Sequence, residues 1–306
     1  MTRFRSLLRF PLTPVGRSRG LVLTLALAVS AAAWATPFQV TDPVLNRYDL
    51  SPDAGLSADL HRALQEVSGL ATSPDGRLFA HHDERATLYQ VDPESGGILK
   101  AFSAGFMGVP GDFEGLAIAG DRFFLSTSDG QLVEFREGED GSSVGYRIHS
   151  TGLGARCEME GLAFDPAEGA LLLPCKTPRD RVLEDYIVVF VVPLETLEPA
   201  VLPRVFLPLN ELKAMDVNDK FHPSAIEVHP ETGSILLVAA REEALLELSS
   251  QGRLLAAKKL KRKDHPQPEG LAFLPDGTLV LADEGQGAPG QLTRYPPRNV
   301  GGGGGS

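Results

Sequence analysis

The chain has 306 residues, of which 42% are hydrophobic, 29 are Lys or Arg and 40 are Asp or Glu. A formal net charge of −11 at pH 7 favours cations and excludes the strongly basic surface that binds nucleic acid or anionic lipid. Length alone does not decide between one domain and two, because an all-β architecture can use about 250 residues in a single domain.

The first 35 residues have the composition of a secretory signal. A positively charged region precedes the apolar run LVLTLALAVSAAA and the small-x-small site Ala33-Trp34-Ala35, so cleavage is expected after Ala35. The mature chain would be periplasmic or extracellular, without a membrane span, and its 24 basic and 40 acidic residues would give it a formal charge of −16. An uncleaved membrane anchor is the alternative, although the apolar run is shorter than the ~20 residues of a spanning helix. The positive region contains Arg3, Arg5, Arg9, Arg17 and Arg19.

The main body, predicted as one domain over residues 36–298, repeats one pattern five times. The copies open at residues 68, 114, 160, 224 and 269, which are 46, 46, 64 and 45 residues apart. A period of this size is typical of one four-stranded blade of a β-propeller. The copies begin SGLATSPDG, EGLAIAGD, EGLAFDPAEG, SAIEVHPETG and EGLAFLPDG.

Each copy contains three predicted strands. An apolar run meets a turn rich in Gly, Pro and Asp, and a second apolar run follows, which is the signature of a hairpin. A third strand then closes the unit. The third strands are LYQVD from Leu88, LVEF from Leu132, IVVFVV from Ile187, LLELS from Leu245 and LTRY from Leu292.

A few segments lie outside the repeat. Residues 57–65 are expected as a short helix, and residues 193–221 form a long excursion after the third copy. The last copy stops after its third strand, so we expect residues 44–50 to supply the missing outer strand and close the ring, which protects the sheet edges. A flat sandwich is the competing architecture, but it would not require five evenly spaced copies. The glycine-rich tail, residues 299–306, is predicted to be a flexible linker.

Two cysteines, Cys157 and Cys175, are the only ones in the chain. They lie just before one predicted strand and at the end of the next, which would bring them close across a hairpin. An exported protein can oxidise such a pair. The sequence leaves a disulfide and two free thiols equally open.

The first residue of each opening marks the candidate site. In a propeller the first strand of each blade lies nearest the axis, so equivalent positions meet at one mouth of the central channel. Here these positions hold three carboxylates, Glu114, Glu160 and Glu269, and two hydroxyls, Ser68 and Ser224. Two residues earlier, on the same side of an extended chain, all five positions are polar. They are Glu66, Asp112, Glu158, His222 and Gln267.

Crowded carboxylates raise one another's pKa unless a cation compensates them. A hard divalent ion would do so, and oxygen ligands without thiolates favour calcium, or less readily magnesium or manganese, over zinc. We therefore predict a metal site at Glu114, Glu160 and Glu269. Additional candidates are Glu66, Ser68, Asp112, Glu158 and Ser224. The alternative is that these side chains satisfy backbone N–H groups where blades meet.

The second strand of each hairpin returns toward the same mouth, and its end is polar in every copy. Such a rim is compatible with a bound ligand and equally with ordinary solvated loop ends. It consists of His82, Asp83, Glu84, Asp129, Lys176, Arg241, Glu242, Asp283 and Glu284.

In their order, the openings Ser-Gly, Glu-Gly, Glu-Gly, Ser-Ala and Pro-Glu-Gly resemble the SdiA-regulated family of bacterial proteins, which is similar in turn to repeat propellers of the NHL kind. The resemblance extends from about Arg47 to Tyr295. It implies an all-β, five-bladed propeller with calcium at its shared acidic site and no assigned biochemical activity. By position, the implied ligands are Glu114, Glu160 and Glu269. The fourth opening departs from the pattern, with Ala225 where glycine is usual, which weakens the case for Ser224.

Two functions are compatible with these residues. The preferred one is a monomeric, calcium-binding binding or scaffolding module of the cell envelope, with a ligand or protein partner at the channel mouth. The alternative is a metal-dependent hydrolase of lactones, esters or phosphoesters, similar to six-bladed propellers of the gluconolactonase and phytase types, in which calcium polarises the substrate and activates water.

The hydrolase would need a base at the mouth. His81, His82, His222 and His265 are the histidines in question, and only His222 falls on the inner register. The base would therefore be His222 or Glu158. Lys176 and Arg241 are placed to hold a phosphate. No His-Glu-x-x-His motif occurs, which favours the binding module.

Overall fold

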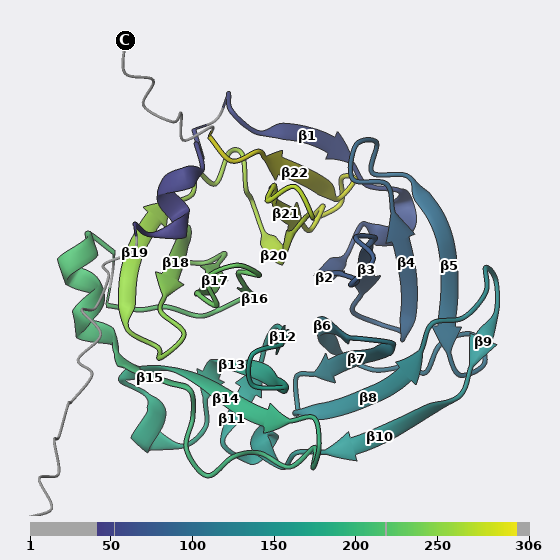
Figure 1. Ribbon diagram of the computed structural model, residues 1–306, viewed down its shortest axis with the longest axis horizontal. Helices are drawn as coiled ribbons and strands as arrows, with labels where there is room; N and C mark the ends of the chain where they lie inside the picture. The colour runs from purple at the N-terminus through teal and green to yellow at the C-terminus, as the bar shows by residue number, and fades with distance from the viewer. Residues whose placement is uncertain (1–41, 52, 218, 299–306) are drawn as a thin grey trace, which may run out of the picture. The chain divides into compact units, whose positions relative to one another are not determined.

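The structure is a computed structural model that describes residues 42–51, 53–217 and 219–298. The predicted signal, residues 1–35, and the glycine-rich tail lie outside the described residues. The described strands form five separate sheets around a central axis, so the molecule is a five-bladed β-propeller, as predicted (Figure 1).

Each blade consists of antiparallel strands that follow one another outward from the axis (Figure 1). The innermost strands are β2 (Val67–Thr72), β6 (Phe113–Ala119), β12 (Ala163–Asp165), β16 (Ala225–Val228) and β20 (Pro268–Phe273). The second strands are β3 (Leu78–His82), β7 (Arg122–Thr127), β13 (Ala170–Pro178), β17 (Ile235–Ala239) and β21 (Leu279–Asp283). The third strands are β4 (Thr87–Val91), β8 (Gln131–Arg136), β14 (Tyr186–Pro193), β18 (Ala244–Leu248) and β22 (Gln291–Tyr295). The outer strands are β5 (Ile98–Ala104), β10 (Tyr146–Ser150), β15 (Val205–Pro208), β19 (Leu254–Lys259) and β1 (Leu56–Asp59). All five predicted third strands are present.

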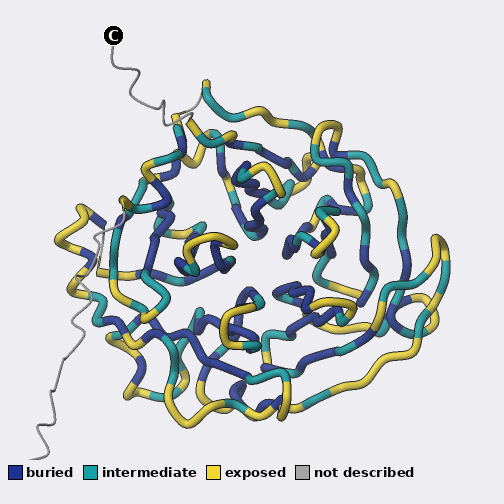
Figure 2. Tube along the Cα trace, in the orientation of Figure 1, coloured by how far each residue is buried: buried dark blue, intermediate teal, exposed yellow. Residues whose placement is uncertain are grey.

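The blades are called first to last by their innermost strands, in chain order. Their inner and second strands are apolar at nearly every position because each blade packs between two neighbours. The strands β17 and β21, for example, are buried along their whole length, which explains their continuous rather than alternating apolar runs. The exposed residues gather on turns and outer strands (Figure 2).

The Pro-Asp-Gly signals correspond to the turns between first and second strands. Gly76 and Gly277 have φ angles of 86° and 82°, in the left-handed region that favours glycine. The opening and the turn of each copy therefore lie at opposite ends of its innermost strand, and the channel has two chemically different mouths.

An N-terminal strand completes the last blade, but it is not the segment that we predicted. The strand β1 pairs antiparallel with β22, from Leu56 opposite Arg294 to Asp59 opposite Gln291. Residues 44–50 instead begin with a 3-10 helix, η1 (Val44–Arg47), because its two adjacent apolar residues, Val44 and Leu45, are buried together against the fourth and last blades. An edge strand would have pointed these two side chains in opposite directions.

The helix predicted over residues 57–65 is mostly absent, because the start of this segment pairs with β22. Its first residues belong to β1, and only η2 (Arg62–Leu64), a 3-10 helix, remains. Tertiary pairing with β22 outweighs the weak local preference of this segment.

The excursion at residues 193–221 is only partly outside the repeat, which corrects the prediction. The strand β15 pairs with β14 and is the outer strand of the third blade. The 3-10 helix η5 (Leu209–Met215) follows it, with Leu212 buried in the core between the third and fourth blades. The remaining short elements are β9 (Ser143–Val144), η3 (Leu153–Ala155), β11 (Cys157–Met159) and η4 (Arg181–Leu183).

Candidate acidic site at the channel mouth

The glycine of each Glu-Gly opening lets neighbouring inner strands approach each other. A Cβ atom on Gly115 would lie 2.4 Å from the backbone N of Leu162, and one on Gly161 would lie 3.2 Å from the Cα of Ala225. The N–H of Gly161 also donates to the carbonyl oxygen of Glu114 at 2.5 Å. Only glycine permits such contacts. The motif therefore places each preceding carboxylate next to the neighbouring blade.

Glu160 is the most deeply buried of the three predicted ligands, with 3% of the residue exposed. The Nζ atom of Lys176 donates to its Oε1 atom at 2.6 Å. Its Oε2 atom is buried and has no hydrogen-bond partner among the described residues. Burial, and then the charge of Glu114, raise the pKa of Glu160 to about 9, although Lys176 opposes the shift. In the described structure, the Glu160 carboxylate therefore has a hydrogen-bond partner on one of its two oxygens and none on the other.

Glu114 and Glu269 share this environment. Burial, followed by the charge of Asp112, raises the pKa of Glu114 to about 7, and its Oε2 atom accepts a hydrogen bond from Ser68 Oγ at 3.3 Å. Burial likewise raises the pKa of Glu269 to about 7. The Nε2 atom of Gln267 donates to Oε1 of Glu269 at 2.7 Å.

The three carboxylates influence one another and Lys176 electrostatically. The charges of Glu114 and Glu269 both act on Glu160, and Lys176 acts on all three. Burial alone would lower the pKa of Lys176, but the three glutamates outweigh it and raise this pKa. Three carboxylates thus share one ammonium group.

A cavity of about 510 Å³ opens over this cluster. Its lining includes Glu160, Glu269 and Lys176, together with His222 and Arg241. His222 is fixed by Glu242, whose Oε1 atom lies 2.8 Å from Nδ1 and whose Oε2 atom accepts the His222 N–H at 2.9 Å. The mouth therefore combines acidic, basic and imidazole groups around one cavity.

The other histidines considered as bases are less suitably placed. His81 is fully buried, and a Cβ atom on Gly69 would lie 2.5 Å from its Nε2 atom. His265 is also buried, with its Nδ1 atom 2.7 Å from Asp283 Oδ2 and its Nε2 atom 2.7 Å from the Tyr295 hydroxyl. His82 is half-buried and does not line the cavity.

Of the additional candidates, Ser68 contacts Glu114 through its hydrogen bond and Asp112 acts on it through its charge, while the others are less closely connected to the three glutamates. Ser224 lines the cavity, but its Oγ atom donates to the carbonyl oxygen of Pro268 at 2.6 Å and so links the fourth blade to the last. Asp112 is exposed and accepts a hydrogen bond from Ser128 Oγ. Glu158 is half-buried on β11, and Glu66 is exposed. Neither of these two lines the cavity.

The side chains at this mouth are of the types that bind a hard cation, although they are not arranged as a complete metal site. Within the described ranges, no three His, Cys, Asp or Glu side chains stand ready to hold a metal ion together. The donors are nevertheless all oxygens, the negative charge exceeds the one ammonium, and Oε2 of Glu160 lacks a partner. A metal ion would have to share Glu160 with Lys176 or replace it. The sequence predicted Lys176 only as a rim residue. It becomes the counter-charge of Glu160 because β13 returns to this mouth.

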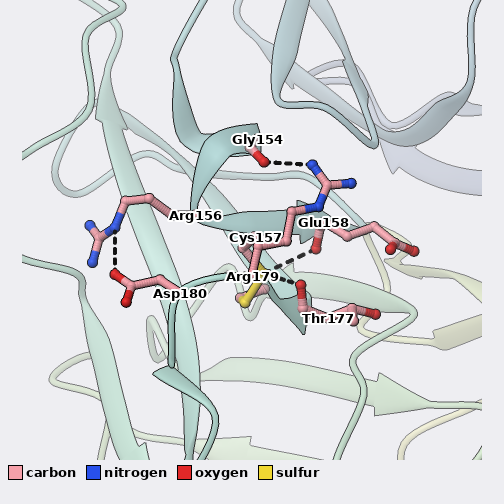
Figure 3. The surroundings of a disulfide bond; sticks show 8 residues. Gly154, Arg156, Cys157, Glu158, Thr177, Arg179 and Asp180 are labelled. Atoms are coloured by element: carbon pink, nitrogen blue, oxygen red, sulfur yellow. Dashed lines mark hydrogen bonds and ion pairs between the residues drawn. A yellow bond between two sulfur atoms is a disulfide. The ribbon is translucent and has the colours of Figure 1, made fainter. Parts of the chain in front are cut away.

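A disulfide joins the strand that carries Lys176 to the strand that ends directly before Glu160. Cys157 and Cys175 are bonded, with Cα atoms 5.6 Å apart, and so join β11 to β13 (Figure 3). Nearby, Arg179 donates to the carbonyl oxygen of Gly154 at 2.5 Å, and Arg156 lies 3.6 Å from Asp180. The cystine lies directly before Lys176 in sequence and shortly before Glu160, so it restrains both.

One short motif does not belong to the site. Residues 141–145 read Gly-Ser-Ser-Val-Gly, the spacing of a hydrolase nucleophile elbow. Its central residue, Ser143, is exposed on β9, which pairs with the outer strand β5. An elbow requires a strand-to-helix turn, so this serine is not a nucleophile of that type.

Comparison with known proteins finds a family model that matches part of the chain and solved structures of the same fold. Residues 204–292 match the family model described as SdiA-regulated. A glutaminyl cyclase from Myxococcus xanthus is 15% identical, with 79% of this chain and 95% of that chain covered, at a TM-score of 0.53. A luciferin-regenerating enzyme is 12% identical, with 81% of this chain and 97% of that chain covered, at a TM-score of 0.50.

At these identities the two solved structures show a shared fold alone. No curated protein matches the sequence. In the part of the chain that the structure describes, none of the helices combines the length and apolar character needed to cross a bilayer. The match over residues 204–292 and the five sheets agree with the resemblance seen in the blade openings: this chain is a five-bladed β-propeller, part of which is similar to the SdiA-regulated family.

Proposed function

We propose that this protein is an exported binding or scaffolding module of the cell envelope whose channel-mouth acidic site takes one hard divalent cation, calcium in preference to magnesium or manganese. The observation that carries the proposal is the charge imbalance at the mouth, where three buried or half-buried carboxylates share a single ammonium group. The partnerless Oε2 atom of Glu160 supports it, because a buried acceptor left unsatisfied is costly.

The residues that would hold the ion are Glu114, Glu160 and Glu269. When bound, calcium would neutralise these carboxylates and link the second, third and last blades. Lys176 would withdraw from Glu160, and its long side chain can turn toward the cavity that it already lines. Ser68 would keep the Glu114 carboxylate in place through the existing hydrogen bond.

Two observations support export. The first 35 residues have the composition of a secretory signal. The bond between Cys157 and Cys175 is of the kind that persists in oxidising compartments. We propose that the mature protein works as a monomer and presents the mouth cavity to a ligand or protein partner.

Thermal denaturation of metal-free protein with added calcium tests the proposal. A ligand at 100 times its dissociation constant that binds only the folded state adds about 2.7 kcal/mol of stability, which raises the melting temperature. Replacing Glu114, Glu160 and Glu269 together by Gln should abolish this rise, whereas Glu231→Gln, at an exposed turn of the other mouth, should keep it. Calcium that stabilises the triple variant as well as the wild type would refute the site.

A metal-dependent hydrolase of lactones, esters or phosphoesters is the second candidate, and the pairing of His222 with Glu242 favours it. A histidine oriented by a carboxylate is the usual form of a general base, and this one shares a cavity with Lys176 and Arg241. The assay is a panel of lactone, ester and phosphoester substrates with and without chelator. Turnover that chelator and His222→Ala both remove would establish the enzyme; its absence across the panel would leave the binding module.

A further inference from the structure

The opposite mouth of the channel contains a second cavity, of about 560 Å³. The turns between first and second strands surround it, and its walls are mainly apolar. A volume of this size is typical of small-molecule sites, which are apolar with few polar groups. The apolar lining includes Leu116, Ile118, Phe164, Val228 and Phe273.

Among the lining residues that belong to innermost strands, Glu227 is the charged one. It is the fourth residue of the fourth opening, and the other four copies have alanine at that place: Ala71, Ala117, Ala163 and Ala272. The strand registers agree with this alignment, because the aligned residues pair with the second strand at the same point of each hairpin. The pairs are Ala71 with Phe79, Ala272 with Val280 and Glu227 with Leu236. One blade therefore carries a carboxylate where the fold requires only a small side chain.

No cation in the described structure compensates this carboxylate. Its Oε1 atom accepts one hydrogen bond, from the backbone N–H of Val228 at 2.7 Å, and Glu227 makes no described ion pair. The basic side chain on the cavity rim, Arg47, is already paired with Glu231 at 3.1 Å. Burial raises the pKa of Glu227 to about 8, with the Val228 N–H as the opposing influence. Glu227 is half-buried, and a carboxylate withdrawn from water is costly unless a partner arrives.

We propose that this cavity binds a small organic amine, whose ammonium group pairs with Glu227 and whose compact apolar body fills the space beside the alanines. An anionic ligand would face Glu227 as well as the acidic rim residues Glu231 and Asp276. A neutral ligand would leave Glu227 without a partner. The acidic net charge of the chain also concentrates cations near its surface.

Three probes of similar shape but different charge test the proposal by isothermal titration calorimetry at about pH 8.5, above the pKa of about 8 that burial gives Glu227. They are 2-phenylethylamine, 2-phenylethanol and 3-phenylpropanoate. The amine should bind, and the alcohol and the carboxylate should bind much more weakly or not at all. Glu227→Ala should weaken amine binding about 10- to 100-fold, the worth of one charged hydrogen bond. This variant should fold, because four blades already have alanine at the same position.

Two further variants locate the site. Glu195→Ala removes an exposed carboxylate that does not line the cavity and should leave amine binding unchanged. The variant with Gln at Glu114, Glu160 and Glu269 should also retain it, because those residues lie at the other mouth; this result is independent of whether calcium binds there. Equal affinity of the amine and the alcohol, amine binding unaffected by Glu227→Ala, or no amine binding to the wild type would each overturn the proposal.

Discussion

The Nζ atom of Lys176 lies 2.6 Å from Oε1 of Glu160, so an ammonium group from the second strand of the third blade enters the ring of carboxylates at the channel mouth. The two residues are 19% and 4% exposed in their side chains, which makes this a largely buried ion pair. Such pairs are costly to break from one side. Lys176 is therefore both part of the fold and the competitor of any metal ion at this mouth.

Lys176→Met should have opposite effects on stability and on metal affinity. Without calcium, the variant should be less stable than the wild type by up to about 3–5 kcal/mol, because Glu160 loses its partner. With calcium, the variant should gain more stability than the wild type does, since no ammonium competes. Urea denaturation with chelator and with calcium measures both. The exposed Lys263→Met is the control; a Lys176 variant that behaves like it would show that the ion pair contributes little.

Glu227 should make the folding free energy depend on pH. Its pKa is raised from 4.5 to about 8 in the folded protein, so the folded state binds more protons than the unfolded state between these values. The stabilisation is complete below about pH 4.5 and is lost as pH rises toward about 8. Glu227→Ala should therefore be less sensitive than the wild type to a change from pH 5 to pH 8.5 in urea denaturation. Parallel profiles for the two proteins would contradict this.

The disulfide should contribute measurably to stability. It closes a loop between residues separated by 18 positions, for which the chain-entropy model gives about 3 kcal/mol. The double variant Cys157→Ala, Cys175→Ala should lose about this amount in urea denaturation. Reducing agent should destabilise the wild type equally and leave the double variant unchanged. An equal response of both proteins to reductant would show that the bond is not the cause.

Glu247 should anchor the N-terminal segment that closes the ring. It is 1% exposed on β18, and its Oε2 atom accepts the N–H of Leu45 in η1 at 2.9 Å. Glu247→Ala should cost about 2 kcal/mol, the typical value for a hydrogen bond to a charged group. The matched control is Glu231→Ala, because its 73% exposed side chain pairs with Arg47 of the same helix and should contribute less than about 1 kcal/mol. Equal losses for the two variants would assign no special role to Glu247.

The sequence by itself determined the number of blades and most of their strands. Each opening, turn and apolar run is a local signal, and five copies at a regular spacing leave only a closed ring as the way to bury them all. The same repeat placed Glu114, Glu160 and Glu269 at one mouth. It also contained the signal for Glu227, a single glutamate aligned with four alanines.

The tertiary structure decided which segments complete the blades and which groups meet. Residues 56–59 rather than 44–50 close the ring, and residues 205–208 form an outer strand, because edge pairing depends on what a distant strand offers and not on local pattern. The contact between Lys176 and Glu160 likewise depends on the bend and register of β11 and β13. Local hydrophobic periodicity fixes strands, whereas the pairing of charges is set by packing between segments far apart in the chain.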